Sequence, residues 1–208
     1  MKTLVLIGGG GHCKSVIEAA ESVNYKILGI LDIPQKLGED VLGYKIIGTD
    51  DDIPNYADNA EFIITVGQIK SSVIRHIIAE RVKKAGGKFA TIIACDAYVS
   101  KHAEISEGTV VLHKAFVNAG AKVGCNCIIN TMVNIEHDAR IGDFCHISTG
   151  TMVNGEAVIG QDCFVGSGST VYNGVSICDE TIIAAASVVN RSLTHPGIYA
   201  GNPVKFIK

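Results

Sequence analysis

From residue 93 to residue 189 the chain carries one repeating pattern of hydrophobic and polar positions, with a period of six. Every sixth residue in this range is Ile or Val. The series runs Ile93, Val99, Ile105, Val111, Val117, Val123, Ile129, Ile135, Ile141, Ile147, Val153, Ile159, Val165, Val171, Ile177, Ile183 and Val189. A period of six differs from the 3.6 residues of an amphipathic helix and from the two of an alternating strand. It is typical of a hexapeptide-repeat parallel β-helix.

The repeat predicts a triangular prism in which three short strands form one coil of 18 residues. The β-branched residue of each hexad points toward the axis, and a compact residue two positions earlier lies beside the corner. These compact residues are Thr109, Ala115, Ala121, Cys127, Val133, Ala139, Cys145, Thr151, Ala157, Cys163 and Ser169. Gly124, Gly142 and Gly160 recur at intervals of 18 and are expected to stack at one corner.

The first part of the chain shows a different pattern, in which apolar runs alternate with helical periodicity. Apolar runs over residues 3–7, 27–31 and 62–66 indicate strands. One helix is expected after the glycines at 8–11, and another between Ser71 or Ser72 and Gly86. The residues expected to share the apolar face of this second helix are Val73, Ile74, Ile77, Ile78 and Val82. Strand–helix–strand alternation predicts a small parallel α/β domain.

These patterns predict three parts: a Rossmann-like α/β domain over residues 1–90, a parallel β-helix over residues 91–190 and a C-terminal tail over residues 191–208. Of the 208 residues 47% are hydrophobic and 19% charged, with a formal net charge of −3, which argues against a nucleic-acid-binding protein. The apolar run at the start is too short for a signal peptide or a membrane span. Seven cysteines without extracellular context favour free thiols in a reducing cytoplasm.

Three of the cysteines, Cys127, Cys145 and Cys163, stand 18 residues apart and are expected on one wall. One interpretation is a ladder of metal ligands. Alanines occupy the equivalent hexad position at 121, 139 and 157, so a small corner residue explains the cysteines equally well. We therefore predict no metal site.

The glycine run after the first strand is a candidate phosphate site. Gly8 and Gly10, with Asp32 further along the chain, partly match a dinucleotide-binding fingerprint, although Cys13 occupies the position of its third glycine. Backbone N–H groups at the start of a helix can hold a phosphate. Asp32 would then contact a ribose or base and His12 would lie beside the phosphate, the alternative being a purely structural turn.

A second candidate site lies on the prism, where His137 follows the inward Ile135 by two positions and therefore points outward. Its neighbours one coil away are Ala119 and Gly155, which leave an open slot around it. Asp138 or Glu136 would raise the basicity of this histidine and fix its tautomer. His146 directly precedes an inward Ile and is also expected to face out.

These features together resemble a family of sugar acyltransferases, the sialic acid O-acetyltransferases and bacillosamine-pathway UDP-4-amino-sugar N-acetyltransferases of the left-handed β-helix superfamily. The similarity extends over essentially all 208 residues. The segments that carry it are Gly8-Gly9-Gly10-Gly11-His12, Leu31-Asp32, Thr65-Val66-Gly67, Ile129-Asn130-Thr131, Ile135-Glu136-His137-Asp138, Ile141-Gly142-Asp143, His146-Ile147-Ser148 and Gly201-Asn202-Pro203-Val204-Lys205.

The resemblance implies a cytoplasmic homotrimer that transfers acetyl from acetyl-CoA to the amino group of a UDP-linked deoxy-amino sugar, with active sites between neighbouring prisms. It assigns the role of general base to His137, with Asp138 increasing its basicity. The residues implied to bind the nucleotide sugar are Gly10, Gly11, His12, Asp32 and Gly67. Those implied to bind acetyl-CoA are His146, Ser167 and Ala185.

Three other hypotheses remain open from the sequence. O-acetylation of a sugar hydroxyl, such as that of a sialic acid, would use the same base. A non-catalytic trimeric scaffold or sugar-nucleotide sensor would keep the aliphatic repeat but would have no need of His137 and Asp138. A nicotinamide oxidoreductase would use the glycine turn, but Cys13 and the lack of a second substrate domain weigh against it.

Overall fold

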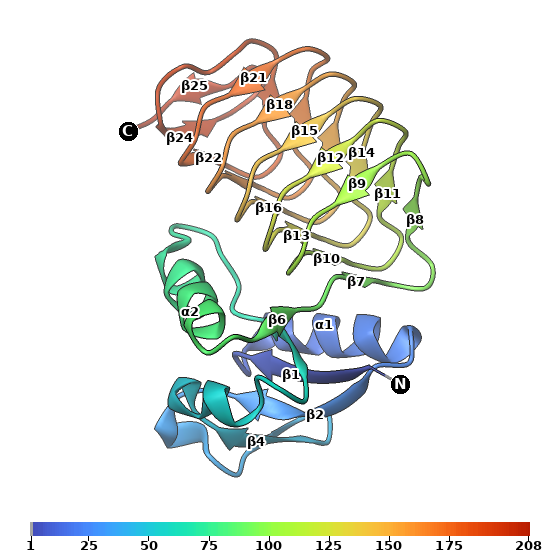
Figure 1. The fold of residues 1–208 in the computed structure, drawn as a ribbon. Coiled ribbons are helices and arrows are strands. Elements are labelled where there is room, and N and C mark those ends of the chain that lie inside the picture. Colours follow the sequence, from blue (N-terminus) through green and yellow to red (C-terminus); the bar gives the residue numbers. More distant parts are fainter. Residues whose placement is uncertain (1) are drawn as a thin grey trace. The chain divides into compact units, whose positions relative to one another are not determined.

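The computed structural model describes residues 2–208. The chain divides into two compact units, one formed by Met1–Gly67 with Ser72–Cys95 and the other by Gln68–Ser71 with Asp96–Lys208 (Figure 1). The first is an α/β unit with a largely parallel sheet, and the second is a parallel β-helix, so the predicted fold class is confirmed. Within residues 2–208 there is no helix with the length and apolar character needed to cross a membrane.

The first unit is built on one sheet with the strand order β3-β4-β2-β1-β5-β6, parallel except for the β3–β4 hairpin. Its strands are β1 (Thr3–Ile7), β2 (Lys26–Leu31), β3 (Asp40–Val41), β4 (Tyr44–Gly48), β5 (Glu61–Ile64) and β6 (Lys88–Phe89). Its helices are α1 (Gly11–Ser22), α2 (Val73–Lys84) and the short 3-10 turns η1 (Pro34–Lys36) and η2 (Asp50–Asn55). β1 is an uninterrupted apolar run buried along most of its length, as expected of a central parallel strand.

The buried face of α2 differs from the predicted one. Val73, Ile74 and Ile77 are exposed by 60%, 61% and 49%, so the prediction that they share the buried face was wrong. The residues that α2 buries are Arg75, Ile78, Ala79 and Val82. These four follow the helical spacing i, i+3, i+4, i+7, which forms one stripe along a helix. An apolar side chain outside that stripe cannot reach the sheet.

The second unit stacks short parallel strands into three walls (Figure 1). One wall contains β10 (Val110–Val111), β13 (Ile128–Ile129), β16 (His146–Ile147), β19 (Phe164–Val165), β22 (Thr181–Ile183), β24 (Gly197–Ala200) and the antiparallel β25 (Lys205–Phe206). The second contains β8 (Tyr98–Val99), β11 (Phe116–Val117), β14 (Asn134–Ile135), β17 (Met152–Val153), β20 (Thr170–Val171) and β23 (Val188–Val189). The third contains β9 (Glu104–Ile105), β12 (Lys122–Val123), β15 (Arg140–Ile141), β18 (Val158–Ile159) and β21 (Ser176–Ile177). The strand β7 (Ile92–Ile93) belongs to the first unit.

The aliphatic ladder forms the core of the prism as predicted. From Val111 to Val189 every sixth residue is at most 4% exposed. Val99 and Ile105, in the first coil, are partly exposed. Partner residues in adjacent coils are 18 positions apart, as in the pair of Val117 and Ile135. The hexad therefore sets both the inward face and the strand register.

The corner residues also behave as predicted. A Cβ on Gly142 would lie 2.7 Å from the carbonyl carbon of Gly160, so a corner of this shape requires glycine. The thiols of Cys127, Cys145 and Cys163 donate to carbonyl oxygens at 3.1, 2.9 and 3.2 Å, and burial raises the pKa of Cys145. Among residues 2–208 no group of His, Cys, Asp or Glu side chains is arranged to hold a metal ion. These cysteines bond the coils to one another at the corner.

Candidate functional site

The glycine turn lies between the end of β1 and the start of α1. Gly8 has φ +108°, and a Cβ there would approach Val66 Cγ2 to 2.6 Å, so this position requires glycine. A Cβ on Gly10 or Gly11 would meet no atom within 4 Å, so both face open space. No side chain caps α1 and its first turn has no acidic residue. The exposed N–H groups of this turn are suited to an anion.

Asp32, directly after β2, holds the glycine turn in place. Its Oδ2 accepts a hydrogen bond from the Gly9 amide and pairs with Lys36 Nζ at 3.0 Å, while Oδ1 accepts from the Ile33 amide at 2.7 Å. Burial by itself raises the pKa of Asp32, but the hydrogen bonds from Ile33 and Gly9 and the ammonium of Lys36 together hold the pKa below its usual range. Asp32 is therefore ionised at neutral pH. The sequence predicted that Asp32 contacts a ligand, and the structure shows that it also accepts a hydrogen bond from the glycine turn.

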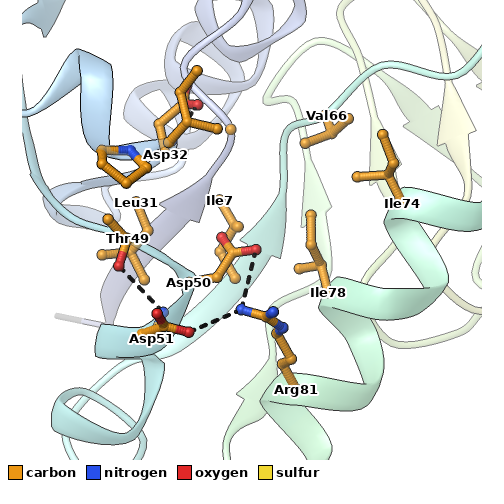
Figure 2. A pocket seen from close by; sticks show the side chains of 13 residues that line it. Ile7, Leu31, Asp32, Thr49, Asp50, Asp51, Val66, Ile74, Ile78 and Arg81 are labelled. Carbon is orange, nitrogen blue, oxygen red and sulfur yellow. Dashed lines mark hydrogen bonds and ion pairs between the residues drawn. The ribbon is translucent and has the colours of Figure 1, made fainter.

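A pocket of about 270 Å³ lies at the carboxyl ends of β1 and β2 (Figure 2). The residues that line it are Ile7, Gly8, Leu31, Asp32, Ile33, Pro34, Thr49, Asp50, Asp51, Val66, Ile74, Ile78 and Arg81. Asp50 and Asp51 begin η2, and Arg81 comes from α2. Arg81 Nη1 lies 3.1 Å from Asp51 Oδ1 and 3.8 Å from Asp50 Oδ2. Burial raises the pKa of Asp50, and the charge of Arg81 opposes this shift. Of the five residues implied to bind the nucleotide sugar, only Asp32 lines this pocket.

We expect Asp32→Ala to raise the KM for a nucleotide-sugar acceptor by about 10- to 100-fold, because the Gly9 amide loses a charged hydrogen-bond partner and the turn loosens. The Kd for acetyl-CoA should stay unchanged, because the residues assigned to it belong to the other unit. Initial rates and calorimetric titrations measure the two quantities. Asp40→Ala, at an exposed carboxylate on β3 of the same sheet, is the matched control. A weakened acetyl-CoA complex would show that this division between the units is wrong.

His137 lies in the turn after β14, with its side chain 54% exposed. Its Nδ1 is 3.0 Å from Asp138 Oδ2. The hydrogen bond that His137 Nδ1–H donates to Asp138 is the main cause that raises the pKa of His137, and the charges of Asp138, Glu136 and Glu156 add to it. An Nδ1–H bound to a carboxylate leaves the neutral imidazole with Nε2 as its proton acceptor. The pair therefore has the arrangement of a general base and its orienting acid.

Gly155, one coil beyond His137, makes the space in which the imidazole lies. A Cβ on Gly155 would come within 2.6 Å of His137 Nε2 and 2.7 Å of Cε1. On the other side, the Asp138 amide donates to the Ala119 carbonyl at 3.1 Å. The two small neighbours inferred from the 18-residue period thus lie next to the histidine in adjacent coils.

We expect Gly155→Ala to lower kcat by about 10- to 100-fold while the protein still folds, because the added methyl displaces the imidazole and a misplacement of about 1 Å can have that effect. Combining it with His137→Ala provides the control. If Gly155 acts only through this ring, the methyl should cost nothing further once the ring is absent. Additive losses in the double variant would contradict this role for Gly155.

Glu136 has different partners from those expected. Its two carboxylate oxygens accept hydrogen bonds from Asn134 Nδ2 at 2.9 Å and Asn118 Nδ2 at 2.8 Å. These two hydrogen bonds hold the pKa of Glu136 below its usual range. Of the two acids that the sequence proposed as helpers of His137, Asp138 makes the hydrogen bond to the ring. Glu136 binds two asparagine side chains on the second wall.

His146 points away from the prism axis, as expected, but it is only 8% exposed. Its Nδ1 lies 2.6 Å from the Gln68 carbonyl oxygen, which can only accept, so Nδ1 carries the proton. Its Nε2 lies 3.1 Å from Asn130 Nδ2 and accepts from that amide. Nothing in the sequence indicated that the Gln68 carbonyl would lie against His146, because the two residues are 78 positions apart along the chain.

Ser167 and Ala185 occupy equivalent places in adjacent coils, since the Ala186 amide donates to the Ser167 carbonyl at 2.9 Å. The Ser167 hydroxyl is 2.8 Å from that of Ser148, which follows β16. Ser167 and Ala185 therefore lie at the corner between the first and second walls. His137 lies at the corner between the second and third walls. Within one chain the structure does not bring these residues together with the candidate base.

Sequence reasoning missed the charged part of the pocket, which consists of Asp50, Asp51 and Arg81. The available signal was the segment Thr49 to Asp52. Thr49 Oγ1 accepts from the Asp51 amide at 3.3 Å, and Asp52 Oδ2 accepts from the Thr49 amide at 2.8 Å. This capping box predicts the start of a helical turn at the end of β4. The position of Arg81 opposite that turn had no local signal.

Two family descriptions match separate parts of the chain. Residues 3–82 match the PglD N-terminal domain, and residues 156–191 match the bacterial transferase hexapeptide of six repeats. None of the curated protein sequences matches the chain.

Solved structures resemble the chain over its full length. The acetyltransferase domain of PglB from Neisseria gonorrhoeae FA1090 is 30% identical, with complete coverage of both chains (100% each) and a TM-score of 0.90. The same domain in complex with acetyl coenzyme A is 29% identical, with 99% of each chain covered and a TM-score of 0.90. PerB from Caulobacter crescentus, in complex with CoA and GDP-perosamine, is 28% identical, with 100% of this chain and 98% of that chain covered and a TM-score of 0.92.

An N-terminal unit of the PglD type, a hexapeptide prism and an identity of 30% over the whole length lead to the same assignment. The chain belongs to the PglD-type sugar acyltransferases of the hexapeptide-repeat superfamily.

Proposed function

We propose that the protein is an acetyl-CoA-dependent N-acetyltransferase that acts on the amino group of a nucleotide-linked deoxy-amino sugar. The observation that carries this proposal is the exposed His137, 3.0 Å from Asp138 and with room made for its ring by Gly155. The solved relatives support it, because one contains acetyl coenzyme A and another contains CoA with GDP-perosamine.

The chemistry requires a base because a protonated amine cannot attack a thioester. His137 Nε2 would take a proton from the sugar amine as its nitrogen forms a bond to the acetyl carbonyl carbon. The carbon–sulfur bond then breaks, and the imidazolium returns the proton to the departing CoA thiolate. Backbone N–H groups would hold the negative oxygen of the tetrahedral intermediate. Asp138 keeps the imidazole oriented and stabilises its protonated form.

The two substrates are assigned to different parts of the chain. Acetyl-CoA would contact His146, Ser167 and Ala185 along the corner between the first and second walls. The acceptor's nucleotide, UDP in the expectation from the sequence, would bind the first unit at Gly10, Gly11, His12, Asp32 and Gly67. These substrates and seven free cysteines favour the cytoplasm.

A homotrimer would bring the base and the acetyl-CoA residues together. His137 and Ser167 lie at different corners of one prism, so a second copy has to supply the missing half of each site. The wall between these corners presents exposed apolar side chains: Tyr98, Phe116 and Met152 are 55%, 38% and 39% exposed. A second prism packed on this wall would cover them. Mixing His137→Ala with Ser167→Ala chains should restore activity if each site draws on two copies.

Release of CoA tests the function directly. The protein should release CoA thiol with a nucleotide-linked 4-amino sugar, and the sugar should gain one acetyl group by mass. Sialic acids and other sugars that offer only hydroxyls are the comparison substrates. Acetylation confined to hydroxyls would replace the proposal by O-acetylation. Binding of NAD without binding of acetyl-CoA would instead favour an oxidoreductase.

A further inference from the structure

We propose that the pocket at the carboxyl ends of β1 and β2 binds the nucleobase of the acceptor and selects guanine, with Asp50 and Arg81 as the residues that recognise it. This inference rests on the proposed function, because it names the nucleotide that the first unit binds. It replaces the UDP expected from the sequence by a guanosine diphosphate sugar.

The size and the apolar lining of the pocket suit a nucleobase. Its volume of about 270 Å³ is below the roughly 300–1,000 Å³ of pockets that bury a whole drug-sized ligand. Ile7, Leu31, Val66, Ile74 and Ile78 supply apolar side chains along it (Figure 2). Ile74 is 61% exposed although it lines the pocket, so a bound base would bury it. One component of a nucleotide sugar is therefore the appropriate occupant.

The charge of the pocket excludes the diphosphate. Its charged lining residues are Asp32, Asp50, Asp51 and Arg81, three carboxylates and one guanidinium. A diphosphate would be repelled there, whereas the uncapped first turn of α1 beyond Gly8 offers N–H groups. Gly8 and Asp32 line the pocket on the side of that turn. With the diphosphate at the turn, the base lies toward Asp50 and Arg81.

Asp50 and Arg81 face each other from different elements. Asp50 is the first residue of η2, and its side chain is 32% exposed. It does not take part in the capping box, which uses Thr49 and Asp52. Arg81, on α2, is 3.8 Å away and 46% exposed. A carboxylate acceptor and a guanidinium donor are thus both available at one end of the pocket (Figure 2).

This pair is more complementary to guanine than to uracil or adenine. Guanine presents two adjacent donors, N1–H and the 2-amino group, which a single carboxylate accepts together, and its O6 and N7 are a recognised arginine target. Uracil presents one N–H between two carbonyl oxygens, which a carboxylate repels. Adenine lacks the second adjacent donor. Asp50 would therefore accept from N1–H and N2–H, while Arg81 donates to O6 or N7.

Binding of free nucleoside diphosphates to the intact wild-type protein tests the base preference without turnover. By titration calorimetry GDP should bind at least about fivefold more tightly than UDP, the lower end of what a bidentate base contact contributes. Inosine diphosphate, which lacks only the 2-amino group, should fall between them. UDP binding as tightly as GDP would overturn the proposal, and so would inosine diphosphate equal to GDP.

The substitution Asp50→Asn tests whether Asp50 recognises the base. Asparagine offers one acceptor and turns an amide donor toward guanine, so GDP affinity should fall at least about fivefold, whereas UDP affinity should not fall, because the carboxylate that repels uracil is gone. Asp58→Asn, at an exposed carboxylate of the same unit, is the matched control. If the Asp50→Asn protein kept the difference in affinity between GDP and UDP, Asp50 would be excluded as the residue that recognises the base.

The outcome separates this inference from the proposed function. If UDP binds best and a UDP-amino sugar is acetylated, the base assignment fails and the acetyltransferase stands. If GDP binds best but no amino sugar releases CoA, the pocket assignment stands and the acetyltransferase fails. Absence of binding by any nucleoside diphosphate overturns the base pocket, whatever the acetyl acceptor is.

Discussion

Replacing His137 by Ala is expected to lower kcat by about 10²- to 10⁴-fold, the usual contribution of a general base. Binding of acetyl-CoA should change little, because in the proposed mechanism the imidazole contacts the acceptor's amine rather than the cofactor's adenine or pantetheine. Calorimetry gives the acetyl-CoA affinity, and rates at saturating substrates give kcat. His102→Ala, at an exposed histidine of an earlier coil, is the matched control and should retain full activity.

The pH profile distinguishes a base from a merely structural histidine. The hydrogen bond donated by His137 to the Asp138 carboxylate raises the pKa of His137, and only the neutral imidazole can accept a proton. Activity should therefore rise with pH through that raised pKa. Asp138→Asn removes the main cause of the shift, so the acidic limb of the profile should move to lower pH. Asp138 has φ +60°, and Asn tolerates this conformation, so the variant adds little strain.

Two results would contradict the assignment of His137. One is a His137→Ala enzyme within a few-fold of wild type at saturating substrate, which would move the chemistry to another group. His146 would be examined next, although its Nδ1–H is already donated to the Gln68 carbonyl. The other is an acidic limb that stays in place in Asp138→Asn. His146→Ala is expected to raise the KM for acetyl-CoA and to leave the pH profile unchanged.

Ile141→Asp is expected to abolish the folded prism. Ile141 is 4% exposed, and its strand β15 pairs with β12 and β18, which place Val123 and Ile159 directly beside it. A carboxylate among these aliphatic side chains has no partner, so it must either pay a large desolvation cost or take up a proton. Urea unfolding followed by circular dichroism should show a loss of several kcal/mol of stability or no folded protein at neutral pH.

The neighbouring position is the control for this substitution. Arg140→Asp introduces the same side chain one residue earlier on β15, where the side chain is exposed. It should unfold within about 0.5 kcal/mol of wild type, as surface substitutions usually do. A folded Ile141→Asp protein with native stability would mean that the inward and outward faces of the hexad are reversed.

The sequence predicted the prism well because the information is local and repeated. A side chain two, six or eighteen positions away has a set place in a β-helix, so the period defines the inward face, the corners and the register. The neighbours of His137 could be found in the same way. Ala119 and Gly155 are each 18 residues from it, and Gly155 lies against its ring in the structure.

The α/β unit was less predictable, because its features depend on contacts between distant segments. The apolar positions of α2 did not show which stripe would face the sheet, and Val73, Ile74 and Ile77 proved exposed. In the second unit the same holds for His146, whose ring is hydrogen-bonded by the carbonyl of Gln68, a residue that no periodicity links to it. Such contacts are decided by how whole elements pack, and a local pattern carries no information about them.

The sequence by itself thus determined the fold class, the core of the prism and the slot around His137. Only the tertiary structure decided that Asp138, rather than Glu136, bonds to that histidine, and that Asp32 holds the Gly9 amide. It also placed Arg81 opposite Asp50, 31 positions earlier in the chain, and so formed the charged end of the pocket. In a repeat, the place of a side chain follows from its position within the period. A pocket forms where separate elements converge, and this convergence depends on the packing of the whole unit.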